Sequence, residues 1–179
     1  MKVISERISI LKKENILSIV ILPGLDKKRL AIIFFWILAW SVCGVIVFIN
    51  YFKETKADLK LFMLIYLSFW TYFEFSIIRA FRWKRSGKEK LWIREGILHY
   101  QRELNGRGKI EEYHLDLISK LQVLELKHSR LADTLNQSFW VKGGERLQFM
   151  AQSKKVLLGM QLNDEEASIV QKEVNSFIP

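Results

Sequence analysis

The chain has 179 residues, 50% of them hydrophobic, and a net charge of +9, which suits one modest domain with a few membrane-spanning segments. Its single cysteine, Cys43, excludes an intrachain disulfide. The positive charge by itself is compatible with nucleic acid, with anionic lipid, or with the charge bias of a membrane protein.

The first 29 residues combine seven Lys and Arg with one apolar stretch. That stretch, Ile16–Leu22, predicts a strand that ends at Pro23-Gly24. Charges run through the segment and no small-residue cleavage site follows it, so we do not expect a cleaved signal peptide. Two placements stay open: the segment lies on a membrane surface, or it packs against the C-terminal domain.

Two long apolar segments follow, Leu30–Phe52 and Leu59–Phe81. About 20 helical residues cross a bilayer core, so each segment is long enough to be a transmembrane helix. Both are apolar around the whole helix rather than along one stripe, which argues against a helix pair in a globular core. The spacer Lys53–Asp58 is short, and it predicts an antiparallel hairpin with both chain ends on one side.

Lys and Arg are concentrated outside the hairpin, before the first span and after the second. This bias predicts that both termini are cytoplasmic and that the hairpin tip is outside. It also accounts for much of the net charge, so we expect no nucleic-acid partner. We expect the flanking basic residues to contact anionic lipid headgroups non-specifically. These membrane-surface anchors are Lys27, Lys28, Arg29, Arg79, Arg82, Lys84 and Arg85.

Glu74 is an acidic residue inside the second apolar segment. A carboxyl at that depth is costly and indicates a specific role. In an antiparallel hairpin it lies level with Trp36, Trp40 and Ser41, which could donate hydrogen bonds to it. Three hypotheses remain open: a neutral hydrogen-bonding group between helices or subunits, a contact with a partner membrane protein, and part of a proton or ion path.

Beyond Arg85, apolar and polar residues alternate, with turn dipeptides at Glu95-Gly96 and Asn105-Gly106. This pattern predicts antiparallel strands joined by hairpins, the third of them Ile110–His114. Further strands are predicted within residues 120–127, 138–143, 146–152 and 155–162.

The last segment changes to helical spacing. Asn163 is a predicted N-cap, and Glu166 three residues later completes a capping box. Four apolar residues share one face of this helix: Ala167, Val170, Val174 and Phe177. About seven short strands closed by this helix predict a pleckstrin-homology-like roll.

The run WKRSGKEKLWIREGILHYQRELNGRGKIEEYHLDLISKLQV, with Gly87-Lys88-Glu89 opening its first strand, resembles the bacterial membrane-anchored pleckstrin-homology-like proteins. The later stretches RLQFMAQ, KVLLGMQL and DEEASIVQKEV resemble the closing strands and helix of that group. The resemblance implies two transmembrane helices followed by a cytoplasmic domain of this type. It implies a fold more firmly than an activity, because most members of the group lack an assigned one.

The predicted fold is therefore a membrane α + β protein: an N-terminal cytoplasmic or interfacial segment (1–29), a transmembrane helical hairpin (30–81), and a pleckstrin-homology-like β-roll capped by a C-terminal helix (82–179). We expect an integral membrane protein, with the bacterial inner membrane as its location.

The sequence offers no arrangement typical of an active site. His99, His114 and His128 match no metal-ligand spacing, and nucleotide-binding or nucleophile motifs do not occur. We therefore expect a non-catalytic interaction or assembly protein without a cofactor, which binds other membrane proteins and could form homo-oligomers. The alternative is a channel or transporter component in which Glu74 titrates.

Overall fold

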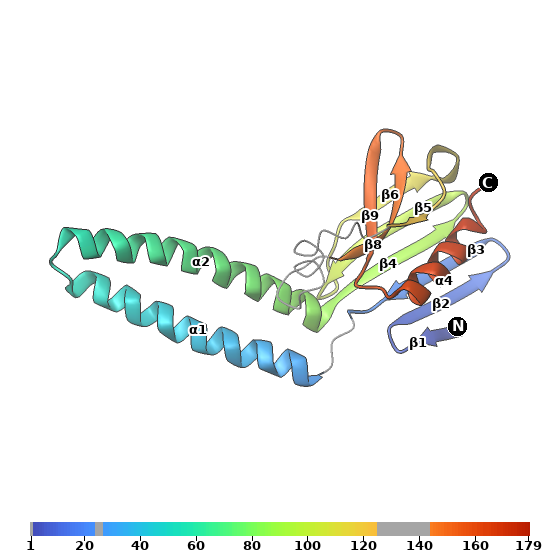
Figure 1. The fold of residues 1–179 in the computed structure, drawn as a ribbon. Coiled ribbons are helices and arrows are strands. Elements are labelled where there is room, and N and C mark those ends of the chain that lie inside the picture. The colour runs from blue at the N-terminus through green and yellow to red at the C-terminus, as the bar shows by residue number, and fades with distance from the viewer. Residues whose placement is uncertain (1, 24–26, 125–143) are drawn as a thin grey trace. The chain divides into compact units, whose positions relative to one another are not determined.

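The computed structural model describes residues 2–23, 27–124 and 144–179. The chain divides into two compact units, which are described one at a time. One unit is formed by residues 25–85. The other combines residues 1–24 with residues 86–179 (Figure 1).

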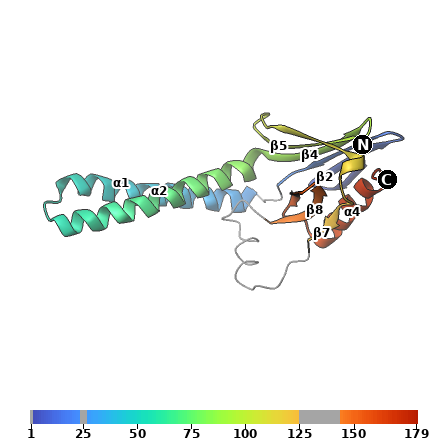
Figure 2. The same ribbon diagram turned by 90° about the horizontal axis from the view of Figure 1, so that it is seen from above.

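The first unit is a pair of antiparallel helices, α1 (Lys27–Lys53) and α2 (Ala57–Ser86), which run side by side in Figure 1 and Figure 2. Both extend past the predicted spans at each end. The carboxylate of Glu54 closes the turn by accepting the N–H groups of Thr55 (2.9 Å) and Lys56 (3.0 Å). Both helices are long and apolar enough to cross a membrane, and only 11% of the most apolar part of each is buried.

The second unit contains a six-stranded antiparallel sheet in which the strands follow their order in the chain. The strands are β1 (Lys2–Ser5), β2 (Ile8–Lys13), β3 (Ile16–Ile21), β4 (Gly87–Arg94), β5 (Ile97–Leu104) and β6 (Ile110–His114). The predicted third strand thus coincides with β6.

The N-terminal segment belongs to this sheet. β3 pairs with β4 along its whole length, from Ile16 opposite Arg94 to Ile21 opposite Glu89. Of the two placements left open, the structure shows packing against the C-terminal domain. This corrects the prediction that residues 1–29 are a separate segment, because residues 1–24 belong to the same unit as residues 86–179. The physical reason is that side chains alternate between the two faces of the sheet along both β3 and β4. The register of their pairing brings Leu17 and Ile19 onto the buried face beside Ile93 and Leu91.

A short 3₁₀ helix, η1 (Leu115–Leu117), leads to a three-stranded sheet of β7 (Gln122–Val123), β8 (Glu145–Ala151) and β9 (Lys154–Met160). β8 and β9 confirm the strands predicted in 146–152 and 155–162. The strand predicted within 120–127 is confirmed at β7, and its part from 125 onward lies outside the described residues. So does the whole strand predicted within 138–143.

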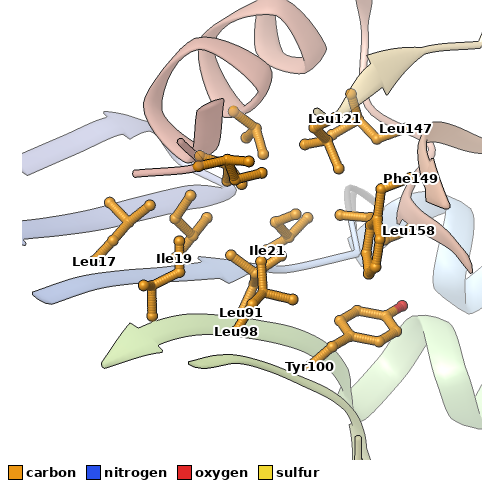
Figure 3. Close-up of a cluster of buried hydrophobic side chains, with 14 of the residues drawn as sticks. Leu17, Ile19, Ile21, Leu91, Leu98, Tyr100, Leu121, Leu147, Phe149 and Leu158 are labelled. Atoms are coloured by element: carbon orange, nitrogen blue, oxygen red, sulfur yellow. The ribbon is translucent and has the colours of Figure 1, made fainter. Parts of the chain in front are cut away.

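The two sheets and helix α4 (Asp164–Asn175) enclose one hydrophobic core, part of which is shown in Figure 3. The predicted helix face is confirmed, because Ala167, Val170 and Val174 are fully buried and Phe177 packs against the core. The capping box is also present. Asn163 Oδ1 accepts the N–H of Glu166 at 2.7 Å, and Glu166 Oε2 accepts the N–H of Asn163 at 3.2 Å. The described chain is therefore an α + β protein.

Candidate functional site

The candidate site lies between the two helices, where Glu74 is buried. Its residue exposure is 9%, although its neighbours Phe73 and Phe75 are exposed. Helical periodicity explains this, since Glu74, Ile77 and Ala80 recur at intervals of three along the buried stripe of α2. Glu74 therefore faces the interior of the hairpin.

Ser41 of α1 is the residue that meets this carboxyl. Its hydroxyl donates a hydrogen bond to Glu74 Oε1 across 2.5 Å. The second oxygen, Oε2, is buried and has no hydrogen-bond partner among the described residues. Ser41, one of the three donors that the sequence nominates, makes this contact, and the second carboxyl oxygen has no partner among the described residues.

A second contact between the helices lies one turn away and involves Trp70. Its indole Nε1 donates to the backbone oxygen of Trp40 at 3.0 Å. The ring lies directly on Gly44, where an added Cβ would be 2.0 Å from Cε2 of Trp70. Position 44 therefore requires glycine for this close approach, as small residues do at many membrane helix contacts.

Trp36 and Trp40 form a stacked pair, with ring centroids 5.1 Å apart and an interplanar angle of 15°. The indole Nε1 of Trp40 is buried and has no hydrogen-bond partner among the described residues, so Trp40 does not donate to Glu74. This corrects the prediction for Trp40. Successive helix residues point in different directions, so Ser41 reaches α2 while the Trp40 ring lies on Trp36.

The basic residues at the open end of the hairpin divide into two sets. Six are exposed: Lys27, Lys28, Arg29, Arg79, Arg82 and Arg85. Lys84 is only 5% exposed, which corrects its assignment as a membrane-surface anchor. It belongs to the buried residues of α2, together with Glu74, Ile77 and Ala80.

Two polar clusters in the sheet unit were not found from the sequence. In the first, Glu89 of β4 is buried and accepts hydrogen bonds from the backbone N–H groups of Gly159 (2.8 Å) and Met160 (2.9 Å) in β9. It also accepts bonds from the Tyr100 hydroxyl (2.8 Å) and from Arg102 Nε (3.2 Å). Burial, together with the charge of Glu89, raises the pKa of Tyr100 above its ordinary value. Glu89 thereby joins the two sheets.

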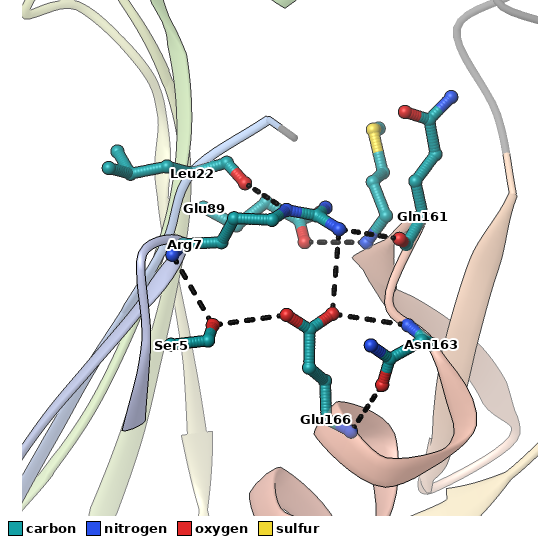
Figure 4. Close-up of polar contacts among 8 residues, drawn as sticks. Ser5, Arg7, Leu22, Glu89, Gln161, Asn163 and Glu166 are labelled. Carbon is teal, nitrogen blue, oxygen red and sulfur yellow. Dashed lines mark hydrogen bonds and ion pairs between the residues drawn. The ribbon is translucent and has the colours of Figure 1, made fainter. Parts of the chain in front are cut away.

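The second cluster joins the N-terminal hairpin to α4 (Figure 4). The Ser5 hydroxyl donates to Glu166 Oε1 at 3.0 Å, and Arg7 Nη1 pairs with Glu166 Oε2 at 3.4 Å. Arg7 also donates to the backbone oxygens of Leu22 and Gln161. The capping glutamate of α4 therefore has a second role, which a local capping pattern does not reveal.

The two described histidines, His99 and His114, do not form part of a metal-binding group. His99 stacks on Trp92 with ring centroids 5.1 Å apart, His114 is exposed, and His128 lies outside the described residues. Within residues 2–23, 27–124 and 144–179, no group of three His, Cys, Asp or Glu residues is placed to hold a metal ion.

Comparisons with models of protein families, with curated proteins and with solved structures find no match to this chain. The class that the structure defines is an α + β chain that carries a pair of helices long and apolar enough to span a membrane.

Proposed function

We propose that this chain is an integral membrane protein of the bacterial inner membrane without catalytic activity, which binds other membrane proteins and presents a pleckstrin-homology-like domain at the cytoplasmic face. The observation that carries the proposal is the insertion of the helical hairpin between two paired strands. β3 and β4 are hydrogen-bonded neighbours, yet α1 and α2 separate them in the chain.

This insertion supports a hairpin with both ends on one side of a bilayer. A folded sheet cannot lie within hydrocarbon, so the chain that leaves β3 has to return to the same side to form β4. Two spans satisfy this requirement, whereas a single span does not. The six exposed basic residues at the open end of the hairpin favour the cytoplasm as that side.

The outer surface of the hairpin supports a role in binding other membrane proteins. Along α1, Phe34, Ile37, Leu38, Ser41 and Val45 line a shallow groove of about 430 Å³. Ser41 lines this groove and also donates its hydrogen bond to Glu74. Apart from Ser41 the lining is apolar, and van der Waals packing drives the association of membrane helices, so this face suits a further transmembrane helix.

The test is purification of the tagged full chain in mild detergent from its native host. We expect a membrane protein to co-elute in a fixed ratio, and a detergent-corrected mass to separate such a complex from a homo-oligomer. Val42→Trp fills the groove and should lower the yield of the complex. Leu61→Trp, at an exposed site of α2 outside this groove, is the matched control. A wild-type chain that purifies alone as a monomer would contradict the proposal.

A channel or transporter component is the second candidate, and it is favoured by Glu74 Oε2, which has no partner among the described residues. A carboxyl oxygen without a partner at that depth is a place where a proton could bind. Proton flux through liposomes that contain the purified chain, abolished by Glu74→Gln, would support this candidate over the first.

A further inference from the structure

The groove along α1 has the spacing of a helix-packing seam. Phe34, Leu38, Ser41 and Val45 line it at intervals of four, three and four residues. This is the repeat with which one helix inserts its side chains between those of another. The three apolar members, Phe34, Leu38 and Val45, are 47%, 52% and 52% exposed, so their side chains are accessible for such a contact. The groove therefore suits one further helix that lies along α1.

Ser41 determines which hydrogen-bonding group this groove can recognise. Among the described residues that line the groove, Ser41 alone has a polar side chain. A serine hydroxyl carries one proton and two lone pairs, and the proton of Ser41 is donated to Glu74 Oε1 at 2.5 Å. Hydrogen bonds in a chain polarise one another, so the contact with Glu74 strengthens Ser41 Oγ as an acceptor. Ser41 therefore offers the groove an acceptor and no donor.

The depth of Ser41 decides what kind of molecule can supply the matching donor. Ser41 lies near the middle of α1, which runs from Lys27 to Lys53. Under the proposed function this is the middle of the hydrocarbon core, where lipids present acyl chains and their polar headgroups are roughly 15 Å away. A side chain of another transmembrane helix can carry a donor to this depth. The groove is therefore matched to a protein helix rather than to a lipid.

A second copy of this chain is one candidate for that helix, and Ser41 argues against a symmetric pair. Copies in one membrane share an orientation, so a two-fold pair brings residues of equal depth together. In a pair formed through this groove, Ser41 would face Ser41 of the second copy. Each hydroxyl has donated its proton to Glu74 of its own chain, so two acceptors would meet with no proton between them. The chemistry favours a different membrane protein.

We propose that the groove along α1 binds a transmembrane helix of a different membrane protein, and that this helix presents a hydrogen-bond donor to Ser41 Oγ. The apolar lining packs against the helix, and the donor selects the helix and its register. The inference rests on the proposed function, because it names the chemistry of the partner that this function requires.

The direct test uses the purified full chain in phosphatidylcholine liposomes and labelled Leu-rich transmembrane peptides that differ in one central residue. The first peptide carries Gln, the second N,N-dimethylglutamine, which accepts but does not donate, and the third Leu. Energy transfer to a labelled chain measures binding, after correction for peptide self-association. The Gln peptide should bind about 3- to 30-fold more tightly than the other two, the effect of one hydrogen bond between membrane helices. Equal binding of the Gln and dimethylglutamine peptides would overturn the inference.

Two serine variants locate the acceptor. Ser41→Ala removes it, so the advantage of the Gln peptide should disappear while the Leu peptide binds as before. Ser68→Ala is the matched control, because the Ser68 hydroxyl of α2 donates to the backbone oxygen of Leu64 and lies outside this groove. It should keep the advantage. An advantage that survives in Ser41→Ala would overturn the site. If Ser41→Ala does not fold, the comparison of the peptides on the wild type still decides.

Disulfide formation between copies tests the choice of a different protein. Cys43→Ala removes the native thiol, and Val42→Cys then places one thiol in the groove. Phe69→Cys, at an exposed position of α2 outside the groove, is the control. Under oxidation in membranes, Val42→Cys should form no more dimer than Phe69→Cys. A disulfide-linked dimer specific to Val42→Cys would place a second copy on the groove and overturn the assignment.

The native complex separates this inference from the proposed function. In the native host, Ser41→Ala should lower the yield of the co-purified partner, and Ser68→Ala should retain it. A complex that tolerates Ser41→Ala overturns the donor but leaves the interaction function in place. If the wild type has no partner, the interaction function fails, and the peptide comparison still decides whether the groove selects a donor.

Discussion

Glu74 and Ser41 form the contact on which the account of the hairpin depends at the level of single residues. The hydroxyl of Ser41 donates to one carboxyl oxygen, and the other oxygen is left without a described partner. If Glu74 has a structural role, it needs only an oxygen that accepts the Ser41 hydrogen bond. If Glu74 carries protons, its carboxyl group must also bind and release a proton.

Glu74→Gln keeps an oxygen that accepts from Ser41, so the free energy of unfolding of the hairpin should change little. Glu74→Leu removes the acceptor and should destabilise the hairpin by about 0.6 to 2 kcal/mol, the range of hydrogen bonds between membrane helices. Unfolding by dodecyl sulfate in mixed micelles measures both values. Normal assembly of Glu74→Gln together with lost cellular function would contradict a purely structural role and favour proton transfer.

Gly44 provides a second test at this scale. Its hydrogen atoms contact the Trp70 ring, so the extra methyl of Gly44→Ala would overlap that ring. We expect a loss of about 1 to 3 kcal/mol in the same unfolding assay, as for other overpacked sites. Ala39→Val enlarges an exposed residue of α1 and serves as the control. If both variants are equally stable, the close packing of α1 on α2 is wrong.

The sequence predicts part of this site and misses the rest for a physical reason. The cost of a buried carboxyl identifies Glu74, and antiparallel depth narrows its partner to a few residues that include Ser41. The direction of each α1 side chain depends on how the helix is rotated about its axis, which local pattern does not supply. Trp70 was missed for this reason, although a glycine in an apolar span was a usable signal at Gly44.

At the scale of elements, Glu89 connects the two sheets through its hydrogen bonds from Gly159 and Met160, and Tyr100 of its own sheet also donates to it. Tyr113 lies on the neighbouring strand β6, and its hydroxyl donates to Glu111. Burial first, and then the adjacent carboxylate, raises the pKa of each tyrosine above its ordinary value. The stability of the sheet unit should therefore fall at alkaline pH.

Each tyrosine keeps its proton in the folded state at pH values where the unfolded chain loses it, so stability is complete below about pH 10 and falls above it. The slope is at most about 1.4 kcal/mol per pH unit for each group. Tyr100→Phe should flatten this fall between about pH 10 and 12, and Tyr113→Phe should flatten it further. Urea unfolding at a series of pH values measures the slope. An unchanged slope in the double variant would contradict the buried, neutral state of these hydroxyls.

Elements defined by local pattern were predicted well, whereas pairing between distant segments was not. The capping box at Asn163 and the alternation in Ile110–His114 lie within a few residues, so the sequence shows them directly. The pairing of Ile19 with Leu91 joins strands on either side of the helical hairpin. Alternation predicts each strand separately, but it does not state which distant strand is the neighbour.

At the scale of the whole molecule, the chain inserts a long apolar hairpin between two paired strands of one sheet. Under the proposed function, this arrangement requires that the hairpin leave and return on the same side of the membrane. It ties the location of the sheet unit to the topology of α1 and α2, so one labelling experiment can test both.

The most direct measurement is the accessibility of single cysteines in cells that express the full chain. Cys43→Ala removes the native thiol, and Thr55→Cys or Ser153→Cys then places one thiol at the helix turn or in the sheet unit, both at exposed positions. A membrane-impermeant maleimide should label Thr55→Cys in intact cells and Ser153→Cys only after the membrane is opened. Labelling of Ser153→Cys in intact cells, or recovery of the chain in the soluble fraction, would contradict the account.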